Sequence, residues 1–186
     1  MRSRNTSRGF SLIELMVVVA VILIITAAAI PQVGRSVALY RLNGAAAEIS
    51  NLIQRARYEA IRQNTTMRVR QDQADGRPRF YADLNNDGDW QANEPVALLS
   101  LTLDLLDEGS VPDPGSMNLG NVTSSPAVIA FDGRGTVDFT GGVPTAYAYY
   151  IGYSGGQTTY GYRAVALTPI GRTRVYKASE KGFWGR

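Results

Sequence analysis

Residues 83–94 place oxygen-bearing side chains at the spacing of a calcium-binding loop. The pattern D-x-[DN]-x-[DN]-G-x5-E is met in full, and Gly88 stands at its sharp turn. The candidate ligands are Asp83, Asn85, Asp87, Asp89 and Glu94. Strand-like residues precede the loop and Pro95 closes it, so the two helices that usually frame such a loop are missing. Two interpretations stay open, a weak Ca²⁺ site and a solvated turn, and no cofactor is required.

The C-terminal end is basic. From Gly155 to Arg186 there are six bases against one acid, in a chain with 19 Lys and Arg against 16 Asp and Glu. A strand at 173–177 puts Arg172 and Arg174 on one face with Tyr176, and leaves Thr173 and Val175 on the other, with Val175 expected in the core. The residues that would extend this cationic, aromatic surface are Lys177, Lys181, Phe183, Trp184 and Arg186. Such a surface suits the phosphates and bases of DNA, but arginines also guard an edge strand against aggregation.

Catalysis is not expected. The chain contains neither cysteine nor histidine, which excludes thiol nucleophiles, imidazole bases and Cys/His zinc sites. No nucleophile–base pair is visible, and the closely spaced carboxylates lie in a turn-like loop. We therefore expect a binding or structural protein, not an enzyme.

A membrane-spanning helix is predicted at residues 10–30. Residues 15–34 carry no charge, and residues 10–30 form a helix of about 30 Å, the thickness of a bilayer core. Arg2, Arg4 and Arg8 precede it, so the rest of the chain should be exported. A cleaved secretory signal, a plain anchor and a buried core helix are the alternatives. Glu14 argues against a disposable signal, because a carboxylate there costs roughly 2.5–3.5 kcal/mol on insertion.

The helical pattern continues beyond the apolar segment, over residues 31–64. Small and aliphatic residues recur there at spacings of four and three: Leu42, Ala46, Ile49, Ile53, Ala56 and Ala60. One helix should therefore run to about Gln63, apolar on all sides in its first half and amphipathic in its second.

Residues 65–186 are predicted to form a β-rich globular domain. Runs of strand-forming residues separated by Gly-, Pro- and Asp-rich loops occur at 66–71, 79–84, 96–103, 127–131, 136–139, 146–153, 160–168 and 173–177. A helix and a sheet each have one apolar face to bury, so the expected fold class is α+β, with an antiparallel sheet packed on the second half of the helix.

The N-terminal residues resemble the signature of type IV prepilins. Gly9-Phe10-Ser11-Leu12-Ile13-Glu14 matches its cleavage site, first mature residue and acidic fifth residue, and Pro31 matches the proline of many such helices. The resemblance implies that residues 1–9 are a leader, removed by an inner-membrane prepilin peptidase that then methylates the Phe10 amine. It also implies that Glu14 pairs with the amino terminus of a neighbouring pilin subunit, which gives a buried carboxylate the partner it needs.

Three further segments are similar to the GspH/FimT family of minor pseudopilins and minor pilins. They are the helix end at 52–64, Phe131-Asp132-Gly133-Arg134-Gly135, and Gly171-Arg172-Thr173-Arg174. The resemblance implies the pilin fold, one pass through the inner membrane, and a periplasmic or filament-borne globular domain. The expected function is a structural subunit of a type II secretion pseudopilus or a type IV pilus. The alternative is a FimT-type minor pilin that binds DNA through Arg172 and Arg174 during DNA uptake.

Overall fold

The computed structural model describes residues 10–138, 145–179 and 182–185. A single helix, α1 (Leu12–Gln63), runs through 52 residues and includes Pro31. The chain divides into two compact units, with the boundary between Ala38 and Leu39, so that each unit contains part of α1. The described part of the first unit is almost entirely helix, and its apolar side chains lie exposed from Phe10 to Val33. This stretch is long and apolar enough to cross a membrane, and none of it is buried within the protein.

In the second unit, α1 supplies one wall of the core. The six positions expected from the periodicity (Leu42, Ala46, Ile49, Ile53, Ala56 and Ala60) are all fully buried. Three of them are alanines, which allow the strands to approach the helix closely. The amphipathic second half of the predicted helix is therefore confirmed.

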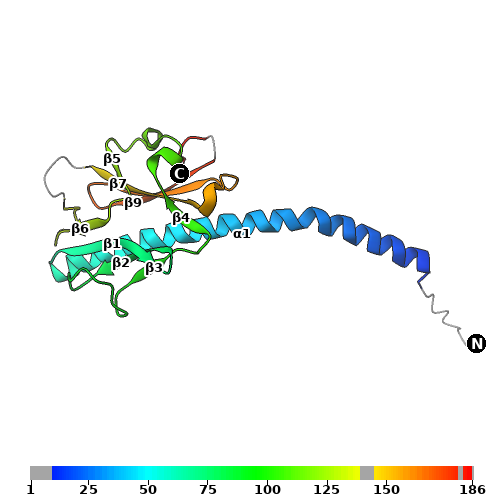
Figure 1. Ribbon diagram of the computed structural model, residues 1–186, viewed down its shortest axis with the longest axis horizontal. Coiled ribbons are helices and arrows are strands. Elements are labelled where there is room, and N and C mark those ends of the chain that lie inside the picture. Colours follow the sequence, from blue (N-terminus) through cyan, green and yellow to red (C-terminus); the bar gives the residue numbers. More distant parts are fainter. Residues whose placement is uncertain (1–9, 139–144, 180–181, 186) are drawn as a thin grey trace, which may run out of the picture. The chain divides into compact units, whose positions relative to one another are not determined.

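Two sheets complete the second unit (Figure 1). The first is antiparallel, in the order β3-β2-β1-β6, and its strands are β1 (Met67–Ala74), β2 (Arg77–Asp83), β3 (Val96–Leu98) and β6 (Val128–Phe131). The second has the order β4-β7-β8-β9, and its strands are β4 (Leu103–Leu106), β7 (Ala146–Tyr153), β8 (Tyr162–Leu167) and β9 (Thr173–Ala178). A short strand, β5 (Val122–Ser124), pairs with β7 in parallel. Three single-turn 3₁₀ helices lie in the connections: η1 (Glu108–Ser110), η2 (Pro114–Met117) and η3 (Ser154–Gly156).

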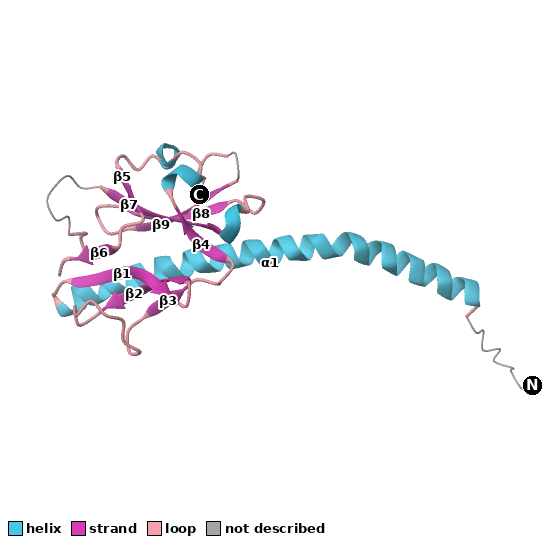
Figure 2. Ribbon diagram, in the orientation of Figure 1, coloured by secondary structure: helices cyan, strands magenta, loops and turns pink. Residues whose placement is uncertain are grey.

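The predicted α+β class is confirmed, with corrections to the strands (Figure 2). The expected strand at 96–103 is two strands in different sheets, because a turn in which the Leu103 amide donates to the Ser100 carbonyl (2.9 Å) separates them. The short, partly exposed β5 was not predicted, since three residues give no readable alternation. Of the expected strand at 136–139, Val137 forms an isolated bridge with Phe131, and residue 139 lies outside the described residues.

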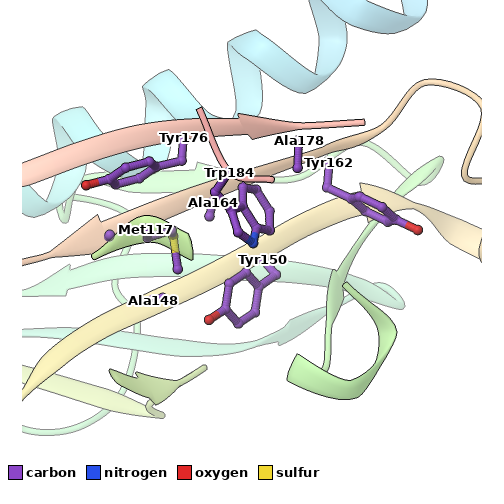
Figure 3. Packing of buried hydrophobic residues seen from close by; sticks show 9 residues of the cluster. Met117, Ala148, Tyr150, Tyr162, Ala164, Tyr176, Ala178 and Trp184 are labelled. Atoms are coloured by element: carbon purple, nitrogen blue, oxygen red, sulfur yellow. The ribbon is translucent and has the colours of Figure 1, made fainter. Parts of the chain in front are cut away.

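Both faces of the second sheet are buried, which is why β7 and β8 read as nearly continuous apolar runs. Tyr149 lies on one face. Its ring packs edge-to-face against the ring of Phe80 in β2, with 4.8 Å between the ring centres, and this contact joins the two sheets. Tyr150 lies on the other face, in a second apolar cluster that includes Met117, Tyr176 and Trp184 (Figure 3). The rings of Trp184 and Tyr150 pack in a tilted arrangement, with 5.7 Å between their centres. The Nε1–H of Trp184 donates a hydrogen bond to the Pro112 carbonyl oxygen at 2.9 Å.

Candidate nucleic-acid and assembly sites

Two side chains on successive turns of α1 hold the start of β9 by hydrogen bonds. The Thr173 hydroxyl accepts hydrogen bonds from Ser50 Oγ at 2.9 Å and from Gln54 Nε2 at 3.1 Å. Gln54 also donates to the Gly171 carbonyl at 3.2 Å. The side chain of Thr173 therefore faces the helix, and the alternation of a strand turns those of its neighbours, Arg172 and Arg174, to the opposite face.

A close contact between two glycines sets the path of the chain before this strand. Arg57 Nε donates to the Gly135 carbonyl at 2.8 Å, directly beneath Gly171. A Cβ on Gly171 would lie 2.5 Å from the Gly135 carbonyl oxygen and 2.7 Å from Arg57 Nε. Gly171 also has a φ of +79°, which disfavours any other residue. Three segments, the helix end, the 131–135 loop and the 171–174 strand, thus meet at one guanidinium.

Arg172 and Arg174 are both exposed, as expected from the sequence. Arg172 ends the turn between β8 and β9, and its amide donates to Thr168 Oγ1 at 3.2 Å. Among the described residues, neither guanidinium takes part in an ion pair. The two charges are therefore open to an anionic ligand on the face of β9 that points away from α1.

Two expectations around this strand are wrong. Tyr176, not Val175, is the core residue: Tyr176 is buried and Val175 is only half-buried. The reason is that a second apolar cluster covers the face expected to be solvent-exposed. Trp184 belongs to that cluster, so it cannot stack on a base, whereas Phe183 is 85% exposed. Lys181 and Arg186 lie outside the described residues.

In the 83–94 loop, the carboxylates are directed at protein donors. Asp83 is completely buried, and its Oδ2 accepts a hydrogen bond from Arg70 Nε at 2.6 Å. Glu94, also buried, accepts the amides of Leu84 at 2.8 Å and Gln91 at 3.1 Å, one on each oxygen. These contacts join the two ends of the loop to neighbouring protein groups.

The centre of the loop is a set of side-chain turns built on Asp87. Its carboxylate accepts the Asp89 amide at 2.9 Å and the side-chain amides of Asn85 at 2.7 Å and Gln91 at 2.5 Å. The Asp89 amide is the main cause of the lowered pKa of Asp87, helped by these side-chain donors against the opposing effect of desolvation. Trp90 then packs over Arg79, with 4.8 Å between the guanidinium carbon and the ring centre. Within the described residues, no three acidic side chains gather into a metal-binding group, so Ca²⁺ binding by these residues stays a prediction.

At the N-terminal end of α1, the sequence Ser-x-x-Glu also has a local function. Ser11 precedes the helix, and the Glu14 amide donates to its hydroxyl at 3.2 Å. This arrangement caps the first turn, and it places Glu14 where a carboxylate also favours the helix dipole. Phe10 and the Glu14 side chain are both exposed. Gly9, the expected cleavage position, lies outside the described residues.

Sequence reasoning missed two arginines that bind backbone. No pattern in the sequence indicated the contact of Arg57 with the Gly135 carbonyl, and no motif pointed to Arg163, which is only 6% exposed. Arg163 Nε donates to Asn43 Oδ1 of α1 and its Nη1 to the Tyr162 carbonyl, both at 2.8 Å. Desolvation lowers the pKa of Arg163 from its usual value. An arginine inside an otherwise apolar strand was the available signal, because such a residue needs specific partners.

Two family models match this chain. The model of the type II transport protein GspH matches residues 45–170, and that of the prokaryotic N-terminal methylation motif matches residues 4–30. No curated protein matches the chain.

Two solved structures of the Pseudomonas aeruginosa type IV minor pilin FimU are similar to it. One, in space group P21, has a TM-score of 0.50 at 21% identity and covers 73% of this chain and 88% of that one. The other, in space group P65, has a TM-score of 0.48 at 21% identity and covers 72% and 91%. The first likeness shows a shared fold, in which a long helix packs on antiparallel sheets. With the GspH model covering more than half of its residues, this chain belongs to the GspH family of type IV pilin-like minor pilins and pseudopilins.

Proposed function

We propose that this protein is a structural subunit of a type II secretion pseudopilus or a type IV pilus, held in the inner membrane until it is assembled. The observation that carries the proposal is the division of α1. Its first half exposes aliphatic side chains all round, whereas its second half is built into the core of the globular unit. A helix of this design needs an apolar partner for its first half, either lipid or the helices of other subunits.

Glu14 gives this assembly its specificity. Within an apolar segment, a carboxylate is costly unless a positive group meets it, and the methylated amine of a neighbouring Phe10 would supply that charge. The capping contact with Ser11 uses the Glu14 amide, so the carboxylate stays available for pairing.

Crosslinking tests this function directly, because a chain without natural cysteines allows pairs to be introduced one at a time. Cysteines placed in the exposed half of α1 should form crosslinks between subunits in filaments. Glu14→Leu should insert in the membrane but lose those crosslinks, while Ser36→Ala, later on the same helix, should keep them. Unchanged crosslinks in Glu14→Leu would refute the pairing. In a deletion strain, loss of secreted enzymes would assign the pseudopilus, and loss of pili would assign the type IV pilus.

DNA binding is a second candidate function, and the exposed pair Arg172 and Arg174 favours it. Their side chains lie on the face of β9 opposite to Thr173, whose hydroxyl is bound by α1, so both can reach one phosphate backbone. No recognition helix is available for a groove, so binding should be independent of sequence and should weaken steeply with salt.

A gel-shift experiment decides between the functions. Replacing Arg172 and Arg174 by glutamine should abolish retardation of DNA at low salt and leave the melting temperature unchanged. The matched control replaces Arg41 and Arg55, two exposed arginines of α1, and should retain binding. If the unmodified protein does not retard DNA at low salt, the arginines protect an edge strand and the filament function stands alone.

A further inference from the structure

Two cations face each other across neighbouring strands at one end of the second unit. Arg163 of β8 and Lys177 of β9 are direct partners in the antiparallel register, so their side chains share one face. That face is turned toward α1, because Arg163 donates to Asn43. Like charges placed opposite each other destabilise a sheet unless an anion balances them.

Further basic and aromatic groups lie at the same end of the unit. Arg41 lies two residues before Asn43, at a similar level of α1 but on a different face of the helix. It lies close enough to Tyr153 of β7 to oppose the rise that burial produces in the pKa of that residue. The backbone of Gly185 pairs with Lys177, which brings the preceding segment with the 85% exposed ring of Phe183 alongside. Tyr40, 78% exposed, adds a second open ring.

Few acids offset these charges. In the described residues, Arg41, Arg163 and Lys177 form no ion pair. Glu48 shares a hollow with Arg41 and Arg77, and Arg77 is itself paired with Asp75 at 3.6 Å. We call the end of the unit that carries Arg41, Arg163 and Lys177, with the rings of Tyr40 and Phe183, the basic end. Its three cations outnumber Glu48, the acid that lies near Arg41.

Chain length ties the basic end to the apolar segment. Only four residues lie between Gly34, the last residue of the uncharged stretch, and Leu39, the first residue of the second unit. The five steps from Gly34 to Leu39 span at most about 18 Å in any conformation. If the apolar segment crosses a membrane, as proposed above, this end of the unit must stay close to the lipid headgroups.

We propose that the basic end docks on anionic phospholipids of the membrane that α1 enters. Cations attract such headgroups, and exposed rings of tyrosine and phenylalanine insert at the interface. Lys177 and Arg41 contact the headgroups, while the buried Arg163 contributes electrostatic attraction from a greater distance. The inference rests on the proposed membrane anchorage, and it assigns a second, electrostatic contact that holds the globular unit down before assembly.

The test uses the full chain in lipid nanodiscs. A fluorophore is attached to a cysteine introduced at Ser179, an exposed position directly after β9. The nanodiscs contain phosphatidylcholine, alone or mixed with phosphatidylglycerol, and a trace of lipid with a nitroxide on its headgroup. We expect phosphatidylglycerol to increase quenching of the fluorophore, and Arg41→Gln with Lys177→Gln to return it to the level in phosphatidylcholine. Each charge removed should shift the docking equilibrium by about fivefold.

The matched control removes Arg134 and Arg172, two exposed arginines beside the contact with Arg57. Arg57 lies about 21 Å along α1 from Asn43, so this variant should quench like the original. The proposal would be overturned if quenching were the same with and without phosphatidylglycerol. It would also be overturned if the control variant lost as much quenching as the Arg41 and Lys177 variant. Loss of subunit crosslinks with unchanged quenching in the Arg41 and Lys177 variant would overturn it too, and would assign the surface to another pilin subunit. Failure of the chain to enter nanodiscs at all would instead refute the anchorage.

Discussion

The Nε of Arg57 donates a hydrogen bond to the Gly135 carbonyl oxygen, 2.8 Å away, and Gly171 crosses directly over the pair. This contact explains why an arginine and two glycines far apart in the sequence are needed together. A larger residue at Gly171 would push the 135 carbonyl away from the guanidinium and displace the start of β9.

Gly171→Ala should therefore lower the free energy of unfolding by about 3 kcal/mol, the combined cost of a left-handed backbone and a steric clash. Gly76→Ala is the control, since Gly76 has a similar φ of +71° but nothing within 4 Å of its Cβ position. It should cost only about 1 kcal/mol. Urea unfolding of the purified chain in detergent measures both, and equal losses would show that the close approach is unimportant.

Arg70 neutralises a carboxylate that has no access to water. Asp83 is fully buried, and its Oδ1 has no hydrogen-bond partner among the described residues. Arg70→Met should cost about 3 kcal/mol, because it leaves that charge unpaired. Arg68→Met should cost about 1 kcal/mol, because the hydrogen bond of Arg68 within the described part of the chain goes to the neutral amide of Asn86. Adding Asp83→Asn to Arg70→Met should recover part of the loss, and no recovery would contradict the pairing.

Glu59, near the end of α1, should respond to acid. Hydrogen bonds from Arg62, with a further one from Gln63, lower the pKa of Glu59 from 4.5 to about 2. A lowered pKa in the folded state means that the contribution to stability is present above pH 4.5 and is lost as the pH falls toward 2. Titration followed by NMR should show this pKa, and Arg62→Gln or high salt should raise it toward 4.5. If neither Arg62→Gln nor high salt raised the pKa of Glu59, the ion pair with Arg62 would not be the cause of the lowered pKa.

Calcium binding remains a prediction of the 83–94 pattern. Its affinity should be weak, in the millimolar range, because Asp87 and Glu94 must first release their amide donors. Ca²⁺ at about 10 mM should raise the melting temperature, and Asp87→Ala should remove the rise. Mg²⁺ at the same concentration serves as the control. No shift with Ca²⁺ would leave the loop as a hydrogen-bonded turn.

Processing can be read from the mass of the mature protein. Cleavage between Gly9 and Phe10 leaves 186 − 9 = 177 residues, and methylation adds one methyl group to the new amine. Intact-mass measurement from a host with prepilin peptidase should show this species, whereas Gly9→Asp should keep the leader. A chain that begins after Ala29 would instead indicate ordinary secretion.

Periodicity made the helix and its core face predictable, because six buried positions repeat over five turns from Leu42 to Ala60. The second apolar cluster was not predictable in the same way. Trp184 and Met117 are far apart in the sequence and lie in irregular segments, so no repeat connects them. The exposure of Arg172 and Arg174 followed from strand alternation, but the attachment of their strand to α1 depends on hydrogen bonds from Ser50 and Gln54 to Thr173 and Gly171. Contacts of this kind join distant parts of the chain and leave no local pattern.

The continuity of α1 has a mechanical consequence. One unbroken helix of 52 residues includes both the exposed apolar segment and the wall of the globular core. Force applied along α1 within the globular unit therefore reaches β9 through side chains of the helix itself. Ser50 and Gln54, which bind Thr173 of β9, would share such a load in shear. Bonds loaded in shear must fail together, so a filament subunit built this way resists being pulled apart.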